Sequence, residues 1–295
     1  MKLGLGSAQF GMDYGITNAR GRVCADEVSR ILGLAGAAGI DTIDTASLYG
    51  DAEAVLGSAL IGRPAFRLVT KTPKLDSPGP GVTFADRVET TFDNSCRKLG
   101  VSRVHGLLFH RASDLLSPEG PAAWARAESL KSAGRIARIG VSIADIDSGM
   151  DVARRYPIEI AQLPINILDQ RALKSGFADD LRSRDVELHA RSPFLQGVLA
   201  APIDSLPAFL GAARRHLERL AAALAVQGMG LMEGALRFVL GLSAVDRVIV
   251  GVTSAGEIER LIGIASASTT VDFDFAAWSF DDPNVIDPPK WPAKT

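Results

Sequence analysis

Short apolar runs that end in polar residues alternate with longer segments of helical periodicity along the whole chain. Such runs are typical of buried strands, and their alternation with helices is typical of βαβ units. The pattern predicts eight strands: Leu3 to Ser7, Thr42 to Asp44, Arg67 to Lys71, Gly106 to His110, Ile136 to Ser142, Ile158 to Leu163, Val186 to Arg191 and Val245 to Val250.

Helical segments follow these strands one by one. They are Ala25 to Ala38, Ala52 to Leu60, Phe84 to Leu99, Trp124 to Ala133, Ile146 to Arg155, Phe177 to Arg184, Leu206 to Ala225 and Ala255 to Ile264. Eight helices after eight strands is the count of a closed (β/α)₈ TIM barrel. An open doubly wound sheet accounts for fewer units, and GLGSAQFG matches its Gly-rich motif only loosely because no helix is predicted directly after it.

The length of 295 residues, of which 47% are hydrophobic, suits one barrel domain over residues 1–295. No linker or internal repeat divides it, and the Pro/Gly/Ser-rich stretches Leu75 to Val82 and Ala200 to Pro207 are interpreted as exposed loops. The tail from Trp278 contains four prolines and cannot be helical throughout. We expect it to lie on the barrel surface.

The charge balance of 32 basic and 34 acidic residues argues against a nucleic-acid or anionic membrane partner. The two cysteines, Cys24 and Cys96, have no CxxC partner, so neither a zinc site nor a disulfide framework is indicated. No basic leader or membrane-length apolar run is present. A cytoplasmic protein acting on a small molecule is the resulting expectation.

Four polar residues lie at or just beyond the ends of predicted strands, where (β/α)₈ barrels place their active residues. Asp44 closes the second strand, Tyr49 follows in its loop, Lys71 closes the third and His110 the fourth. Each alone has a structural explanation, such as a helix cap or a core histidine. Together they predict chemistry, because an ammonium beside a phenol favours the phenolate and a neutral imidazole can donate to a carbonyl oxygen.

These residues resemble the aldo-keto reductase family. The resemblance runs through GLGSAQFG, GIDTIDTASLYGDAEAVLGSAL, VTK, LLFHR, IGVS, IAQLPIN, ARSPFLQG and VIVGVTS, and so covers nearly the whole chain. The family's catalytic tetrad falls on the four residues named above. The resemblance also implies an NAD(P)H cofactor extended over the barrel mouth, hydride transfer from its nicotinamide, and no metal.

The same resemblance assigns further residues to the cofactor. Beside Asp44, the implied cofactor-binding residues are Gly6, Ser7, Ala8, Ser142, Gln162, Arg191, Ser192, Pro193, Phe194, Gln196, Gly197, Gly251, Val252, Thr253, Ser254 and Glu257. Arg191 stands where many members have an aromatic residue against the nicotinamide, and a guanidinium can also stack on a flat ring. The alternative is that Arg191 faces a carboxylate on a neighbouring loop.

The adenosine end favours NAD(H) over NADP(H). Family members usually carry Lys or Arg there for the 2′-phosphate, whereas this chain has Thr253 and Glu257. A carboxylate repels a phosphate dianion and accepts hydrogen bonds from a ribose diol. Arg260, one turn further on, is a possible replacement for the missing phosphate contact.

The opening block GSAQFGMDYGITN is rich in polar groups and suggests a sugar or sugar derivative as substrate. Trp124 and Trp278 are candidates for the pocket wall or for ordinary packing. Two other functions stay open: a regulatory barrel that binds nicotinamide with little turnover, and a lyase or epimerase using Tyr49 and Lys71. We expect the protein to be a monomer or a simple homo-oligomer.

Overall fold

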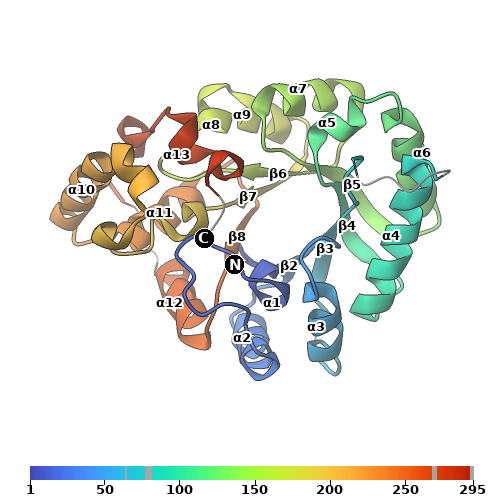
Figure 1. Ribbon diagram of the computed structural model, residues 1–295, viewed down its shortest axis with the longest axis horizontal. Coiled ribbons are helices and arrows are strands. Elements are labelled where there is room, and N and C mark those ends of the chain that lie inside the picture. Colours follow the sequence, from blue (N-terminus) through green and yellow to red (C-terminus); the bar gives the residue numbers. More distant parts are fainter. Residues whose placement is uncertain (64, 77–81, 268–270, 293–295) are drawn as a thin grey trace.

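The computed structural model of the protein describes residues 1–63, 65–76, 82–267 and 271–292. Eight parallel strands close into a barrel in the order of the sequence, each hydrogen-bonded to the next and β8 to β1 (Figure 1). The strands are β1 (Leu3–Gly6), β2 (Thr42–Asp44), β3 (Arg67–Lys71), β4 (Val104–Phe109), β5 (Ile136–Ser142), β6 (Ile160–Pro164), β7 (Glu187–Arg191) and β8 (Arg247–Gly251). The predicted single-domain (β/α)₈ fold is therefore confirmed.

Helices connect the strands and surround the barrel (Figure 1). The longer ones are α2 (Ala25–Ala37), α3 (Ala52–Ala59), α4 (Phe84–Leu99), α6 (Gly120–Ser132), α7 (Ile146–Arg155), α9 (Phe177–Ser183), α10 (Gly211–Val226), α11 (Leu231–Gly241) and α12 (Ala255–Ser266). Short turns are α1 (Ala8–Gly11), α5 (Ala112–Leu115), α8 (Arg171–Lys174), α13 (Pro283–Ile286), η1 (Leu195–Gly197), η2 (Ile203–Ser205), η3 (Ala208–Leu210), η4 (Phe275–Trp278) and η5 (Pro288–Lys290).

Two helices correct the sequence prediction. Helix α1 opens one residue after Ser7, directly behind the Gly-rich strand, where no helix was predicted. Helix α11 occupies a segment that the prediction left unassigned, and it buries Leu236, Phe238 and Val239 beside the barrel. Periodicity misses a four-residue turn such as α1, and the Gly-containing start of α11 weakens its helical signal.

Element boundaries differ from the prediction by a few residues. Strand β8 begins at Arg247 and not at Val245, because the backbone of Val245 closes a turn on Leu242. Helix α10 begins at Gly211, five residues after the predicted Leu206, because Pro207 and the 3₁₀ turn η3 come first.

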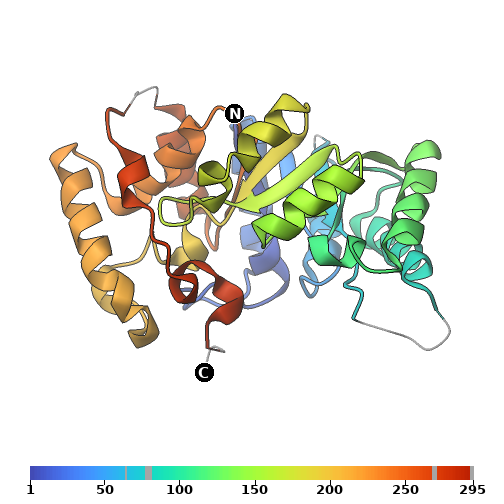
Figure 2. The ribbon, with the colours of Figure 1, turned by 90° about the horizontal axis from the view of Figure 1, so that it is seen from above.

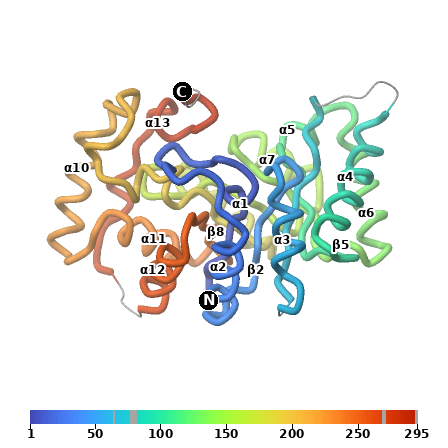
Figure 3. The backbone as a smooth tube through the Cα atoms, turned by 60° about the horizontal axis from the view of Figure 1, so that its bottom comes forward, coloured from blue at the N-terminus to red at the C-terminus, as the bar shows by residue number. Residues whose placement is uncertain are grey.

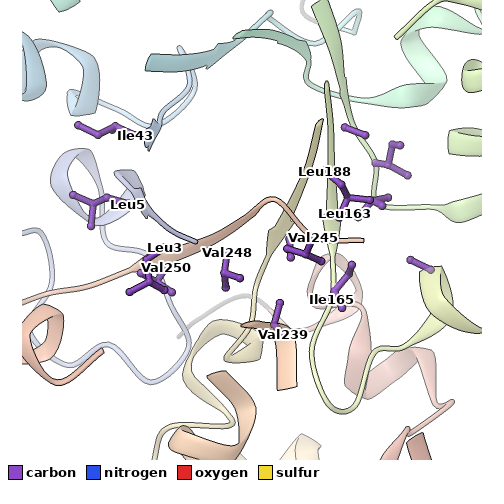
Figure 4. Packing of buried hydrophobic residues seen from close by; sticks show 14 of the residues in the cluster. Leu3, Leu5, Ile43, Leu163, Ile165, Leu188, Val239, Val245, Val248 and Val250 are labelled. Atoms are coloured by element: carbon purple, nitrogen blue, oxygen red, sulfur yellow. The ribbon is translucent and has the colours of Figure 1, made fainter. Parts of the chain in front are cut away.

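The hydrophobic core fills the space between the barrel wall and the helices. Figure 4 shows Leu3, Val248 and Val250 from adjacent strands near Val239 of α11. All four side chains are completely buried. Burying a side chain of this size contributes about 1.5–3 kcal/mol, so this layer stabilises the barrel that positions the site.

A charged cluster lies at the opposite end of the barrel from the predicted site, where several strands begin. Glu187 accepts hydrogen bonds from His105 at 2.9 Å and His189 at 3.0 Å, and its carboxylate lies 3.1 Å from Arg138. Burial by itself would raise the pKa of Glu187, but the hydrogen bonds with the two histidines outweigh it and hold the pKa far below its ordinary value. The cluster joins β4, β5 and β7.

The C-terminal tail packs against α10 and the loop after β6. His216 of α10 contacts the carbonyl of Trp278 at 3.0 Å and the ring of Phe280 at a centroid distance of 5.1 Å. Gln170 donates to the carbonyl of Phe275 at 2.8 Å. Figure 2 shows this red segment beside the gold helix α10.

Within the described ranges no single helix has the length and hydropathy for a membrane span, although residues 208–226 and 231–241, bent by 80°, pass that test as a pair.

Candidate active site

Lys71 and Asp44 form a buried ion pair at the carboxyl ends of two adjacent strands. The ammonium of Lys71 donates to the carboxylate oxygens of Asp44 at 2.7 and 2.8 Å, and to the carbonyl of Thr45 at 2.9 Å. Parallel pairing of β2 with β3 brings the two strand ends together. Burial by itself would lower the pKa of Lys71, but the interactions with Asp44 and Tyr49 outweigh it, so the pKa lies above its ordinary value.

Tyr49 lies beside this ion pair. The ammonium nitrogen of Lys71 is 4.8 Å from the centroid of the Tyr49 ring. The backbone around Tyr49 is held by Gly11 of α1, where a Cβ atom would meet the carbonyl oxygen of Tyr49 at 2.0 Å. The short helix that the sequence analysis missed therefore packs directly on the loop that carries the phenol.

His110 completes the group of four. Its ring meets that of Tyr49 edge-on, with the centroids 6.2 Å apart. Burial lowers the pKa of His110 to about 3, and the positive charges of Lys71 and Lys74 act in the same direction. The imidazole is therefore neutral at physiological pH. Its buried Nδ1 atom has no hydrogen-bond partner among the described residues.

Asp44 also binds a residue from the other side of the barrel. The side-chain amide of Gln162, on β6, donates to Asp44 Oδ1 at 2.8 Å. Sequence reasoning assigned Gln162 to the cofactor and did not predict this contact. The separation of 118 positions explains why, since only closure of the barrel brings the two residues together.

A cavity of about 500 Å³ extends from Tyr49 across the barrel mouth to the start of α12. This volume lies within the range of small-molecule and cofactor sites, which is about 300–1,000 Å³. The predicted site residues that line it are Gly6, Ser7, Ala8, Asp44, Tyr49, Gln162, Arg191, Ser192, Pro193, Phe194, Gln196, Gly197, Gly251, Val252, Thr253 and Glu257.

Four predicted residues do not line this cavity. Lys71 lies buried behind it and His110 beside Tyr49. Ser142 ends β5 next to Gln162 in the strand register, and the hydroxyl of Ser254 caps α12 by accepting the backbone N–H of Glu257. Ser142 and Ser254 therefore do not line the cavity, and their assignment to the cofactor stays a prediction.

The two tryptophans considered for the pocket wall pack elsewhere. Trp124 stacks on Phe109 in the core, with ring centroids 5.9 Å apart. Trp278 contacts His216 in the tail packing. Neither lines the cavity, so packing is the correct reading for both.

The loop after β7 has an unusual backbone. Ser192, Leu195 and Gln196 have φ values of 57°, 46° and 54°, in the left-handed region that non-glycine residues seldom adopt. Such conformations are retained where the surrounding structure demands them, and they cluster at ligand-binding segments. The N–H groups of Leu195 and Gly197 donate within the loop to the carbonyls of Ser192 at 3.0 Å and Phe194 at 2.9 Å, and Pro193 has no N–H, so an anion would be bound by the other N–H groups of the loop.

Arg191 has no carboxylate partner among the residues described. Its guanidinium donates at 3.4 Å to the carbonyl of Ile143 and at 3.4 Å to the hydroxyl of Ser192. The alternative that Arg191 faces a carboxylate on a neighbouring loop is therefore wrong. Its positive charge is directed to the cavity and contributes to the low pKa of His110.

The far end of the cavity is built around the start of α12. The carboxylate of Glu257 accepts from the backbone N–H of Thr253 at 2.7 Å and from its hydroxyl at 2.9 Å. Glu27 of α2 accepts from the backbone N–H of Ala255 at 2.6 Å. The carboxylates of Glu257 and Glu27 thus accept hydrogen bonds from backbone N–H groups at the start of α12. Sequence reasoning identified Glu257 but missed Glu27, which is 228 positions from its partner.

Tyr14 is a second phenol at the cavity that the sequence analysis did not single out. It lies in the loop between α1 and α2 and lines the cavity together with Tyr49. Partial burial raises the pKa of Tyr14, and the charge of Arg191 acts in the opposite direction. The only available sequence signal was its place in the polar opening block.

Fold and site together define a (β/α)₈ barrel whose candidate active centre and nucleotide-sized cavity share the carboxyl ends of the strands. The chain belongs to the aldo-keto reductase family, because the family model described as "Aldo/keto reductase family" matches residues 2–279. Membership in this family implies NAD(P)-dependent oxidoreduction of a small carbonyl compound.

Solved structures share the fold. The chain is similar to the aldo-keto reductase AKR11C1 from Bacillus halodurans in its holo form, with 23% identity, a TM-score of 0.76 and coverage of 92% of this chain and 88% of that one. It is also similar to the glycerol dehydrogenase AKR11B4 from Gluconobacter oxydans, with 20% identity, a TM-score of 0.71 and coverage of 94% and 90%. No curated protein sequence matches it.

Proposed function

We propose that the protein transfers hydride between a nicotinamide and a carbonyl or alcohol carbon, with Tyr49 as the general acid and base. The observation that carries this proposal is the ammonium of Lys71, held by Asp44 and 4.8 Å from the centroid of the Tyr49 ring. A fixed positive charge beside a phenol stabilises the phenolate left after proton donation.

Each of the four residues has its own role in the proposed reaction. Asp44 holds the Lys71 ammonium in place, and Lys71 stabilises the phenolate of Tyr49. His110, whose low pKa keeps it neutral, donates a hydrogen bond to the substrate oxygen and orients the carbonyl towards Tyr49. The nicotinamide, when bound, supplies or accepts the hydride. Tyr49 then delivers the proton to the alkoxide oxygen in reduction and removes it in oxidation.

The cavity fits an extended dinucleotide. Ser7 is completely buried at the Tyr49 end, and its hydroxyl has no hydrogen-bond partner within the described part of the chain, so a ligand amide would satisfy it. Arg191 is suited to stack on the nicotinamide. The loop of left-handed residues after it is suited to a diphosphate.

NAD(H) is the preferred cofactor in this proposal. A 2′-phosphate at the start of α12 would meet the carboxylate of Glu257, which lines the cavity and already accepts the N–H group of Thr253. A phosphate dianion beside this carboxylate is repelled, whereas a ribose diol can donate to it. Arg260 lines the same end and reduces this repulsion without removing it.

The proposed substrate is a sugar or another polyol derivative. The side-chain amide of Gln9 lines the cavity alongside the hydroxyl-bearing Tyr14, and amides and hydroxyls are the usual partners of sugar hydroxyl groups. The glycerol dehydrogenase among the similar structures is consistent with a polyol.

The decisive experiment compares wild type with Tyr49→Phe in NADH-dependent reduction of a panel of aldoses, with NADH binding followed by fluorescence. We expect turnover to fall at least a thousandfold while NADH affinity changes less than threefold, because the phenol supplies a proton and not an anchor. Unchanged turnover in the variant would sink the assignment of Tyr49.

Two other outcomes identify the alternative functions. Tight NADH binding by wild type without oxidation by any substrate in the panel would indicate a regulatory barrel. Exchange of substrate hydrogen with solvent deuterium, without net NADH consumption, would indicate an elimination or epimerisation that uses Tyr49 and Lys71.

A further inference from the structure

Three arginines line the cavity without a carboxylate partner among the residues that the structure describes. They are Arg20, Arg191 and Arg260, whereas the acidic side chains lining the described cavity are Asp44 and Glu257. The charge of Asp44 is compensated by Lys71. The cavity therefore carries excess positive charge, which fits an anionic ligand.

Arg20 is the arginine whose position needs explanation. It belongs to neither the tetrad nor the strand ends, and its guanidinium has no hydrogen bond or ion pair with another described residue. Its neighbour Arg22, in contrast, forms an ion pair with Asp51 at 3.0 Å and does not line the cavity. Two arginines two positions apart thus have different surroundings.

The loop that carries Arg20 has a defined conformation. The side-chain oxygen of Asn18 accepts the backbone N–H groups of Arg20 at 2.9 Å and Gly21 at 3.1 Å. The amide of Asn18 donates to the carbonyls of Tyr14 at 3.1 Å and Gly21 at 3.0 Å. One asparagine therefore ties both ends of the turn, as in an Asx turn.

This loop meets the loop after β7. The hydroxyl of Thr17 donates to the carbonyl of Gln196 at 3.5 Å, and a Cβ atom on Gly197 would lie 1.8 Å from the same hydroxyl. Gly197 has a φ of 100°, so its conformation and its space both require glycine. Figure 3 shows the dark-blue N-terminal loop arching beside the yellow-gold segment after β7.

We infer that Arg20 binds the diphosphate of the dinucleotide, opposite the loop of residues 192–197. This inference rests on the proposed NAD(P)-binding function and adds a residue that the resemblance does not assign. The diphosphate is the ligand group whose charge matches an unpaired guanidinium, and Arg forms bidentate hydrogen bonds with phosphate oxygens. The Thr17 contact with Gln196 joins the loop that carries Arg20 to this segment.

The test measures binding of NADH, ADP-ribose and adenosine to wild type, Arg20→Gln and the matched control Arg22→Gln. We expect Arg20→Gln to bind NADH and ADP-ribose about tenfold to a hundredfold more weakly, and adenosine equally well. Arg22→Gln should match wild type, because exposed ion pairs contribute little. Arg20→Lys should restore part of the affinity, and the loss should shrink as salt concentration rises.

The outcomes separate this inference from the proposed function. Failure of wild type to bind either NADH or ADP-ribose would overturn the proposed function itself. Normal NADH binding by wild type with equal affinity in Arg20→Gln would overturn only the role of Arg20. An effect on the KM of an anionic carbonyl substrate without an effect on ADP-ribose would also overturn it, since the arginine would then bind substrate. Equal thermal unfolding of wild type and the three variants excludes misfolding as the cause.

Discussion

The ammonium of Lys71 and the carboxylate of Asp44 are joined by two hydrogen bonds of 2.7 and 2.8 Å, with both residues almost entirely removed from solvent. Ion pairs of this kind cost desolvation energy and give little net stability. The proposed role of this pair, which is to hold a positive charge beside Tyr49, is separate from stability, and the energetics of the pair can be measured.

Lys71→Met should destabilise the protein by about 3–5 kcal/mol, because it leaves the carboxylate of Asp44 buried without its counter-ion. The double variant Asp44→Asn with Lys71→Met removes both charges and should be more stable than Lys71→Met alone. Urea unfolding of the four proteins in this cycle gives the coupling free energy. Additive effects of the two substitutions would contradict the buried pair.

Glu257→Gln should increase the affinity for NADPH about tenfold, or about 1.4 kcal/mol, while NADH affinity changes little or falls slightly. The reason is removal of the carboxylate that lines the cavity where the proposed NADPH would carry its 2′-phosphate. Glu259→Gln, on the exposed face of the same helix, is the matched control. An unchanged ratio of the dissociation constants for NADPH and NADH would refute the role of Glu257 in disfavouring NADPH.

Glu187→Gln should lower the free energy of unfolding at pH 7 by about 2–3 kcal/mol, because charge-assisted hydrogen bonds to His105 and His189 are lost. The folded-state pKa of Glu187 is depressed, so its contribution is present above the unfolded pKa of about 4.3 and disappears as the pH falls through the folded value. The difference between variant and wild type should therefore narrow below pH 4. Urea unfolding at pH 7 and pH 3 tests this, and an equal difference at both would count against it.

His110 should stay neutral across the working pH range, since its pKa is lowered to about 3 by burial and the nearby lysines. Its ring resonances should not titrate between pH 5 and 8 in NMR spectra, with His110→Gln used for assignment. In the unfolded state the imidazole of His110 takes up a proton near pH 6.5, whereas in the folded state it does so only near pH 3. The contribution of the neutral His110 to the free energy of unfolding is therefore fully present above about pH 6.5. Stability should then fall by up to about 1.4 kcal/mol per pH unit on further acidification. A titration midpoint near 6.5 in the folded protein would contradict the neutral imidazole.

The candidate catalytic residues were predictable because they sit at element boundaries that the hydrophobic pattern locates. Asp44, Lys71 and His110 each end or follow an apolar run, and parallel strands of a barrel bring such ends to one face. The closed barrel itself follows from the alternation of strands and helices, which local periodicity encodes. The predictions for helix α11 and for the start of α10 were less accurate, because glycine and proline weaken that local signal.

By itself, the sequence determined the barrel, the strand ends that carry the candidate residues, and the family, since these depend on local patterns and on residue identity along the chain. Only the tertiary structure decided that Gln162 binds Asp44, that Glu27 reaches the start of α12, and that Trp124 packs away from the cavity. The physical reason is that each of these contacts joins side chains from separate elements. Their partners depend on register and on rotamers in the closed barrel, which no spacing along the chain encodes.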